Sequence, residues 1–246
     1  MRRLVFVDLD DTLFQSEHKN PAADQPAAVD REGRPHSFLC ERQAAFLAWL
    51  VRDATVVPVT GRNLDAFRRV VLTLGEWAIC SFGGVILGPG DALDLEWQRR
   101  MSASAADSAA PMEALHRMVA EHAAAHEVDV RHRVICDAGL SLYLSVKHNT
   151  GSAAELARLA GVMAPAVPAE WTVHLNGNNL ALLPPFLNKA NAVAYFLERH
   201  AGADQPLTIG VGDSLTDLGF MALCDYIITP GGSQIHGAMS PCGATA

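Results

Sequence analysis

Three aspartates stand directly behind a short apolar run near the start of the chain. The stretch LVFVDLDDTLF contains Asp8, Asp10 and Asp11. Like charges this close repel, so solvent, a cation or a role in chemistry has to compensate for them. Carboxylate oxygens suit a hard cation such as Mg²⁺, which binds through a few carboxylates together with substrate phosphate. A carboxylate can also attack phosphorus to form an aspartyl-phosphate, and a second one can act as acid and base.

Further polar residues follow other apolar runs of the sequence. Thr60 follows TVVPV, Asp213 follows LTIGV, and Lys189 opens a predicted helix. In open parallel sheets, ligands bind outside the carboxyl ends of the strands, so we expect these residues to form one site with Asp8 and Asp10. A hydroxyl and an ammonium suit the oxygens of a phosphoryl group. The pattern therefore predicts phosphoryl-transfer chemistry with a divalent cation.

A parallel sheet is predicted to position these residues. The run before Asp8 is continuously apolar, which is typical of a strand buried on both faces. Strands are also predicted at 55–59, 207–211 and 226–228, and helices around Phe46–Leu50, from Leu64 to Leu74, and over 189–200 and 214–222. Residues 15–37 are polar and indicate a loop or a small hairpin flap. Strands that alternate with helices predict an α/β, doubly wound, Rossmann-like parallel sheet.

The alternation breaks in the middle of the chain. Between about Gly84 and Pro184 the pattern predicts a hairpin, a helix near 112–125, strands at 128–136 and 140–147, a helix near 153–163, and two more strands. The last pair, VHLNGNNLALL, alternates on both sides of an Asn-Gly turn signal. We therefore expect a core domain of residues 1–83 and 184–246, and an inserted α+β cap domain of residues 84–183.

Composition excludes several classes of protein. The 246 residues are half apolar, enough for a sizeable core, and the net charge of −8 argues against binding to nucleic acid or to an anionic membrane. No apolar stretch approaches the length of a membrane span. The five cysteines are widely spaced and include no CxxC pair, which is typical of reduced thiols. These features predict a soluble, cytoplasmic protein.

Each motif also has an ordinary structural interpretation. The DDT stretch could be a helix cap and turn, Lys189 a solvated lysine, and GDSLTD a helix capped by Ser214. The joint occurrence of the motifs, in order and at strand ends, favours catalysis. The sequence has no complete GxGxxG and no GxxxxGK[ST] loop, which argues against a dinucleotide site and an NTP-driven motor.

Two further groups of residues have competing interpretations. His116, His122 and His126 share a predicted helix, but no HExxH accompanies them, so partly exposed helix residues are favoured over a metal site. Trp171 and two asparagines, 176 and 178, could line a sugar pocket. For the asparagines, turn chemistry is favoured.

The motifs together resemble the haloacid dehalogenase superfamily of phosphohydrolases. DLDDT fits its DxDxT signature, VTGR its second motif, Lys189 in LNKANAV its lysine motif, and GDSLTD its acidic motif. The insertion resembles the family's type-two cap. Its element order is closest to the branch that contains sucrose-phosphate, mannosyl-phosphoglycerate and trehalose-phosphate phosphatases.

The resemblance assigns the carboxylates. Asp8 would be the nucleophile and a metal ligand, and Asp10 the acid and base, with its backbone carbonyl on the metal. Asp213 would complete the Mg²⁺ site, and Asp217 would support the metal waters or Lys189.

The resemblance also assigns the phosphoryl contacts, which would come from Thr60, Arg62 and Lys189. The chain departs from many relatives at two positions. Thr216 stands where many have Asn, and Phe82 precedes a glycine where many have an Asn-Gly pair. Both departures concern substrate identity rather than the core chemistry.

The expected function is that of a Mg²⁺-dependent phosphatase of a small phosphorylated metabolite, foremost a sugar phosphate, acting through an aspartyl-phosphate. The alternatives are a sugar-phosphate phosphomutase and a non-catalytic metabolite-binding relative. The core motifs contact only phosphoryl oxygens, which every phosphate ester has. We therefore expect residues 84–183 to close as a lid and to choose the substrate.

Overall fold

The computed structural model describes residues 1–202 and 205–239, so Cys242 and the end of the predicted core domain lie outside the described residues. The chain divides into two compact units. Unit 1 comprises Met1–Asp94 and the segment that begins at Asn188, and unit 2 comprises Leu95–Leu187.

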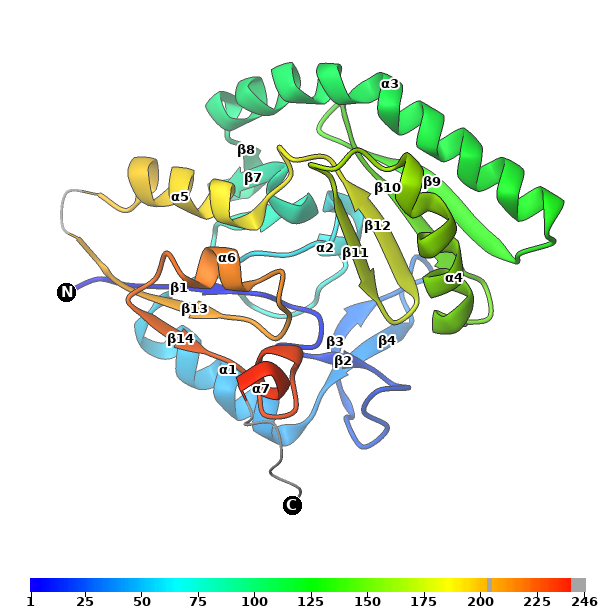
Figure 1. Ribbon diagram of the computed structural model, residues 1–246. Helices are drawn as coiled ribbons and strands as arrows, with labels where there is room; N and C mark the ends of the chain where they lie inside the picture. The colour runs from blue at the N-terminus through cyan, green and yellow to red at the C-terminus, as the bar shows by residue number, and fades with distance from the viewer. Residues whose placement is uncertain (203–204, 240–246) are drawn as a thin grey trace. The chain divides into compact units, whose positions relative to one another are not determined.

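Unit 1 is built on a parallel sheet, as the sequence predicts (Figure 1). Its strands, in spatial order, are β14 (Tyr226–Ile228), β13 (Leu207–Val211), β1 (Arg3–Val7) and β5 (Thr55–Pro58). Every adjacent pair is parallel. The carboxyl ends of these strands therefore lie along one edge of the sheet, where the sequence places its polar residues.

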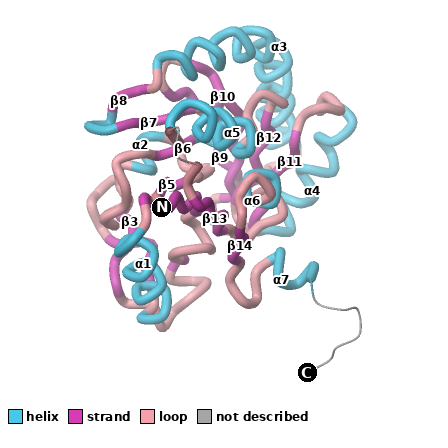
Figure 2. The backbone as a smooth tube through the Cα atoms, turned by 90° about the vertical axis from the view of Figure 1, so that its left-hand side faces the viewer, coloured by secondary structure: helices cyan, strands magenta, loops and turns pink. Residues whose placement is uncertain are grey.

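Helices cover both faces of this sheet. Figures 1 and 2 show α1 (Glu41–Asp53) on one side, and α5 (Lys189–His200) and α6 (Leu218–Met221) on the other. Alternate residues of β1 pack against the helices on the two faces of the sheet, because successive side chains of a strand point to opposite faces. Val5 packs in one cluster with Leu50 of α1, whereas Phe6 meets Phe196 of α5 edge-on, with ring centroids 5.6 Å apart.

Two small antiparallel sheets complete unit 1, together with α2 (Leu64–Phe67) and α7 (Gln234–Met239). The strands are β2 (Gln15–Ser16), β3 (Gln25–Val29) and β4 (Pro35–Leu39) in one sheet, and β6 (Ala78–Cys80), β7 (Val85–Gly88) and β8 (Ala92–Leu93) in the other. The first sheet stands where the sequence predicts a loop or hairpin flap.

Two helices are shorter than predicted. The helix expected from Leu64 to Leu74 ends at Phe67, because the chain beyond it pairs with β3: the Val71 N–H donates to the carbonyl of Ala27. The helix expected over 214–222 occupies only α6. The turn before α6 is held by its own side chains, since Asp217 accepts hydrogen bonds from both the backbone and the hydroxyl of Ser214.

Unit 2 is an antiparallel sheet covered by two helices. The strand order is β11 (Thr172–Asn176), β12 (Asn179–Leu183), β10 (Leu140–His148) and β9 (Val130–Asp137), and the helices are α3 (Leu95–Ala125) and α4 (Ala153–Met163). The predicted hairpin is present as β11 and β12. Asn178 in its turn hydrogen-bonds the backbone of His148 in both directions, at 2.8 Å each, which is a structural role.

Helix α3 begins well before the predicted start near residue 112. Its buried stripe continues upstream at spacings of three and four through Trp97, Met101, Ala105 and Ser108. The small residues in this stripe and Pro111 obscure the period, so the sequence pattern is weak there. None of the described helices, α3 included, is both long and apolar enough to cross a membrane.

Candidate active site

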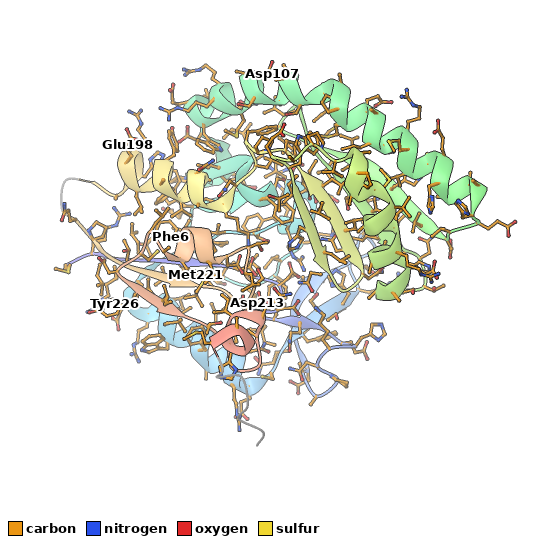
Figure 3. All side chains as sticks on the ribbon, viewed as in Figure 1. Phe6, Asp107, Glu198, Asp213, Met221 and Tyr226 are labelled. Carbon is orange, nitrogen blue, oxygen red and sulfur yellow. The ribbon has the colours of Figure 1, made fainter. Side chains whose placement is uncertain are left out.

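The carboxyl end of β1 places Asp8 beside Asp213. The Asp8 N–H donates to the carbonyl of Val211 at 2.9 Å, so Asp8 continues the pairing of β1 with β13. Asp213 lies in the loop after β13 (Figure 3). The hydroxyl of Thr12 lies 3.0 Å from Asp213 Oδ1 and 3.3 Å from Asp8 Oδ2, and all three side chains are buried. The sequence predicts that these two aspartates lie close together, and Thr12 is the threonine of the DLDDT stretch, but the sequence predicts no role for this threonine.

Lys189 joins the same cluster from the first turn of α5. Asn188 caps this helix by accepting a hydrogen bond from the Ala190 N–H. The Lys189 ammonium donates to Asp8 Oδ1 at 2.6 Å and to Asp217 Oδ1 at 2.7 Å, and its side chain is 7% exposed. Lys189 is therefore not a solvated lysine, the ordinary interpretation of its motif.

Burial and charge perturb the pKa values of the cluster in opposite directions. Burial raises the pKa of Asp8 well above its ordinary value, against the opposing effect of Lys189. Burial by itself would raise the pKa of Asp217, but the ammonium of Lys189 and hydrogen bonds from Lys189 and Ser214 hold it below the ordinary range. The pKa of Lys189 is raised, because its two carboxylates outweigh its burial. The ammonium therefore stays protonated between two carboxyl groups.

The raised pKa of Asp213 means that its ionised carboxylate destabilises the folded protein. Burial, and then the charge of Asp217, raises this pKa from the ordinary 3.8 to about 6. Between these values the folded protein binds a proton that the unfolded chain lacks, so stability falls as the pH rises from about 4 to about 6. We expect Asp213→Asn to stabilise the metal-free protein by about 1–2 kcal/mol at pH 7, after a discount for solvent screening, and to have no effect at pH 4.

Thermal unfolding in a chelator at the two pH values measures this change. Asp225 is the matched control, because the backbone and side chain of Thr208 lower its pKa. Asp225→Asn is therefore expected to destabilise the protein at pH 7. A destabilising effect of Asp213→Asn at pH 7 would contradict the assigned direction of its pKa.

The cluster has the donor set of a hard-cation site. One carboxylate oxygen from each of Asp8, Asp213 and Asp217 lies within 4.8 Å of the other two, and all three residues are buried. This is the only such group of three or more acidic, histidine or cysteine residues in the described part of the chain. Such oxygens fit Mg²⁺. The sequence predicts Asp8, Asp10 and Asp213 as metal ligands, and two of these, Asp8 and Asp213, belong to this group.

The Asp10 side chain is instead paired with Arg62. The guanidinium donates from Nε and Nη2 to the two carboxylate oxygens, at 2.7 Å each. Arg62 is itself held by the carbonyl of Ala66 and lies over the ring of Phe14, with only 11% of its side chain exposed. Because two parallel hydrogen bonds fix the carboxylate plane, this pair determines where Asp10 points. The sequence singles out both residues but does not predict their contact.

Thr60 lies at the end of the neighbouring strand. It is buried, and its hydroxyl accepts a hydrogen bond from the Arg62 N–H at 3.0 Å. The next residue is Gly61, where a Cβ would lie 2.5 Å from the ring of Phe82, so any side chain at this position would force that ring to move. Phe82 and Ser81 both have left-handed backbone angles, with φ of 55° and 52°. Asparagine adopts this conformation more readily than phenylalanine, which gives a physical meaning to the Asn-Gly pair of many relatives.

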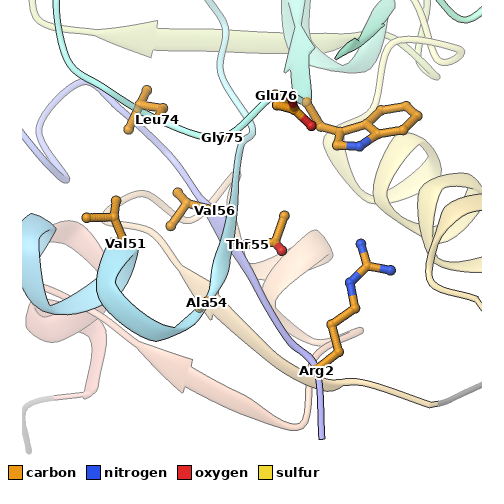
Figure 4. A pocket seen from close by; sticks show the side chains of 9 residues that line it. Arg2, Val51, Ala54, Thr55, Val56, Leu74, Gly75 and Glu76 are labelled. Carbon is orange, nitrogen blue, oxygen red and sulfur yellow. The ribbon is translucent and has the colours of Figure 1, made fainter.

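A cavity of about 330 Å³ in unit 1 lies away from this cluster (Figure 4). Its lining includes Arg2, which precedes β1, and Thr55, with which β5 begins. It is therefore at the amino ends of the strands, whereas ligands of open parallel sheets bind at the carboxyl ends.

Comparison of the whole chain with solved structures identifies the fold. A trehalose-6-phosphate phosphatase related protein aligns with a TM-score of 0.52 and 17% identity over 92% of this chain and 85% of that one. A haloacid dehalogenase-like hydrolase from Bacteroides thetaiotaomicron aligns with a TM-score of 0.50 and 12% identity, over 93% and 94%. The chain has the fold of the haloacid dehalogenase-like hydrolases.

The C-terminal domain of a C. albicans trehalose-6-phosphate phosphatase also has a fold similar to that of this chain. It aligns with a TM-score of 0.50 and 15% identity, over 89% of this chain and 72% of that one. No family model matches the sequence, and no curated protein matches it by sequence. At these identities the likeness establishes the fold, and the activity has to be argued from the site.

Proposed function

We propose that the protein is a Mg²⁺-dependent phosphatase that hydrolyses a small phosphorylated metabolite, foremost a sugar phosphate, through an aspartyl-phosphate. The observation that carries the proposal is the buried cluster at the strand ends. Asp8 lies there between the ammonium of Lys189 and the hydroxyl of Thr12, next to a second carboxylate. The fold supports it, because two of the structures aligned above are trehalose-6-phosphate phosphatases or related to one.

The carboxylates of Asp8 and Asp213, with the backbone carbonyl of Asp10, would hold the cation. A bound Mg²⁺ would neutralise their charge and that of the phosphoryl oxygens. Its binding would also keep Asp8 ionised, although burial raises the pKa of this residue. The ammonium of Lys189 and the hydroxyl of Thr60 would orient the phosphoryl group.

Asp8 and Asp10 would divide the reaction between them. A carboxylate oxygen of Asp8 forms a bond to phosphorus while the bond from phosphorus to the leaving oxygen breaks, and Asp10 gives that oxygen a proton. Asp10 then accepts a proton from water, whose oxygen displaces Asp8 and releases inorganic phosphate. In the structure Arg62 holds both carboxylate oxygens of Asp10, so one of these two hydrogen bonds would have to break before Asp10 carries the proton, while the other keeps the carboxyl group in place.

Unit 2 is proposed to choose the substrate. Strand register places Arg131 opposite Lys147 and Arg133 opposite Ser145, on the face of the sheet away from α3 and α4. His174, opposite Ala181, belongs to the same face. Basic and hydroxyl groups of this kind suit the hydroxyl and acidic groups of a phosphorylated sugar, and unmatched polar groups reject wrong substrates.

A panel of phosphorylated sugars and acids, assayed for inorganic phosphate, tests the proposal. We expect turnover with Mg²⁺, loss of turnover in a chelator, and poor replacement by Ca²⁺, which accepts looser coordination. Full activity in excess chelator would overturn the metal site. Turnover that requires a sugar bisphosphate and releases no phosphate would indicate a phosphomutase. Binding of sugar phosphates without any turnover would indicate a non-catalytic protein.

A further inference from the structure

Unit 2 contains a pair of histidines that the proposed reaction does not use. His116 lies on α3 and His132 on β9, and their ring centroids are 5.0 Å apart with an interplanar angle of 66°. The sequence groups His116 with His122 and His126 of the same helix, but the structure brings it to a histidine from another element. This juxtaposition depends on the packing of α3 against the sheet, so no sequence spacing reveals it.

Strand register explains how the two rings meet. His132 is opposite Val146, which belongs to the hydrophobic cluster between the sheet and its helices. His132 is therefore on the helix-covered face, and β9 is the outermost strand of the sheet. On α3, His116 is one position beyond Leu115 of the same cluster. Both histidines are partly exposed, so the pair is at the border between this core and solvent.

Each histidine has a buried ring nitrogen without a hydrogen-bond partner. These atoms are Nε2 of His116 and Nδ1 of His132, and they are the only buried side-chain nitrogen or oxygen atoms without a partner in the described part of the chain. A buried polar atom without a partner loses its hydrogen bonds to water and gains none in return, so native structures contain few such atoms. Two such atoms on rings that touch call for a common explanation.

We propose that His116 and His132 together bind a divalent transition-metal ion of the Zn²⁺, Cu²⁺ or Ni²⁺ type. An ion at about 2.0–2.1 Å from one nitrogen of each ring, with a roughly tetrahedral angle, would hold the two ring centroids about 5 Å apart. The observed separation of 5.0 Å agrees. Neutral imidazole is a ligand that suits all three of these ions, whereas Mg²⁺ prefers oxygen. Solvent would supply the remaining ligands.

The site is chemically distinct from the carboxylate cluster of unit 1. Its two protein ligands come from a helix and from an edge strand, so a bound ion would cross-link α3 to β9 and stabilise unit 2. The proposal does not depend on the phosphatase activity. A protein without any turnover could have the same histidine site.

Cu²⁺ binding followed by electron paramagnetic resonance tests the proposal. Excess Mg²⁺ is present throughout, so that it competes for the carboxylates. The wild-type spectrum is expected to show hyperfine coupling to imidazole nitrogens. We expect His116→Gln and His132→Gln each to weaken binding at least tenfold, and the double variant to lose the nitrogen coupling.

The control is the double variant His122→Gln/His126→Gln, because these two rings also approach each other, at 4.4 Å. It is expected to keep the nitrogen coupling and the affinity. A second measurement is the melting temperature, which Zn²⁺ should raise by a few degrees in the wild type and in this control but not in the His116 and His132 variants. Circular dichroism without metal establishes that each variant folds. Unchanged Cu²⁺ binding in the His116→Gln/His132→Gln protein, or its loss in the control alone, would overturn the proposal.

Discussion

Asp8→Asn is expected to abolish phosphate release while the protein stays folded. An amide has no anionic oxygen to attack phosphorus, so we expect a loss on the order of 10⁴-fold or more in kcat. The fold should survive, because the amide oxygen of asparagine can still accept the hydrogen bond from Lys189 that Asp8 Oδ1 accepts at 2.6 Å. The substitution also removes one of three buried, mutually repelling carboxylates. The measurements are kcat with a sugar phosphate and the melting temperature.

Asp10→Asn and Asp11→Asn separate the nucleophile from its neighbours. Asp10→Asn should still bind substrate but lose about 10²–10⁴ in rate, the usual contribution of a positioned acid and base. Asp11 is the matched control, because its carboxylate forms an ion pair with Lys19 and is not one of the three carboxylates of the buried cluster. Its backbone is left-handed, with a φ of 66°, which asparagine also tolerates. We expect Asp11→Asn to change kcat by less than a few-fold. Equal loss of folding in the variants of Asp8 and Asp10 would show that these residues are structural.

Strand patterns in the sequence predict the part of the fold that positions the site. β1, β5 and β13 are short apolar runs, and a predicted polar residue follows each of them within two positions: Asp8, Thr60 and Asp213. Parallel strands must align their carboxyl ends, so topology alone predicts that Asp8 and Asp213 lie close together. The roles of these residues in catalysis stay predictions, since the structure shows their positions and contacts only.

The sequence could not predict features that depend on packing between distant segments. The chain after Phe67 has helical spacing, but it pairs with β3, which is far away in the sequence. The sequence does not predict the first half of α3, because its buried stripe includes the small residues Ala105 and Ser108 in place of large apolar ones. The Arg62–Asp10 pair and the contact of His116 with His132 likewise join residues whose separation in sequence has no pattern.

Lys189→Met is expected to destabilise the metal-free protein by about 3–5 kcal/mol at pH 7, because removing one partner of a buried ion pair leaves uncompensated charge. Lys189 is the only ammonium that contacts Asp8 and Asp217 among the described residues, and burial raises the pKa of Asp8 even in its presence. Without it, the buried carboxylates repel one another at neutral pH. Saturating Mg²⁺ should restore part of the lost stability by supplying the missing positive charge, although phosphate release should stay low.

The stability lost in Lys189→Met is expected to depend on pH. Below pH 6 the raised pKa of Asp213 allows it to bind a proton in the folded protein, and the raised pKa of Asp8 acts in the same direction. Protonated carboxyl groups do not repel, so the difference between wild type and Lys189→Met should shrink from pH 8 to pH 5. Lys19→Met is the control: it removes a half-exposed ion pair with Asp11 and should cost less than about 1 kcal/mol. Urea unfolding with and without Mg²⁺ measures both variants. If Lys189→Met cost no more than Lys19→Met, the buried cluster would not need its ammonium, and Lys189 would have to be assigned to substrate binding alone.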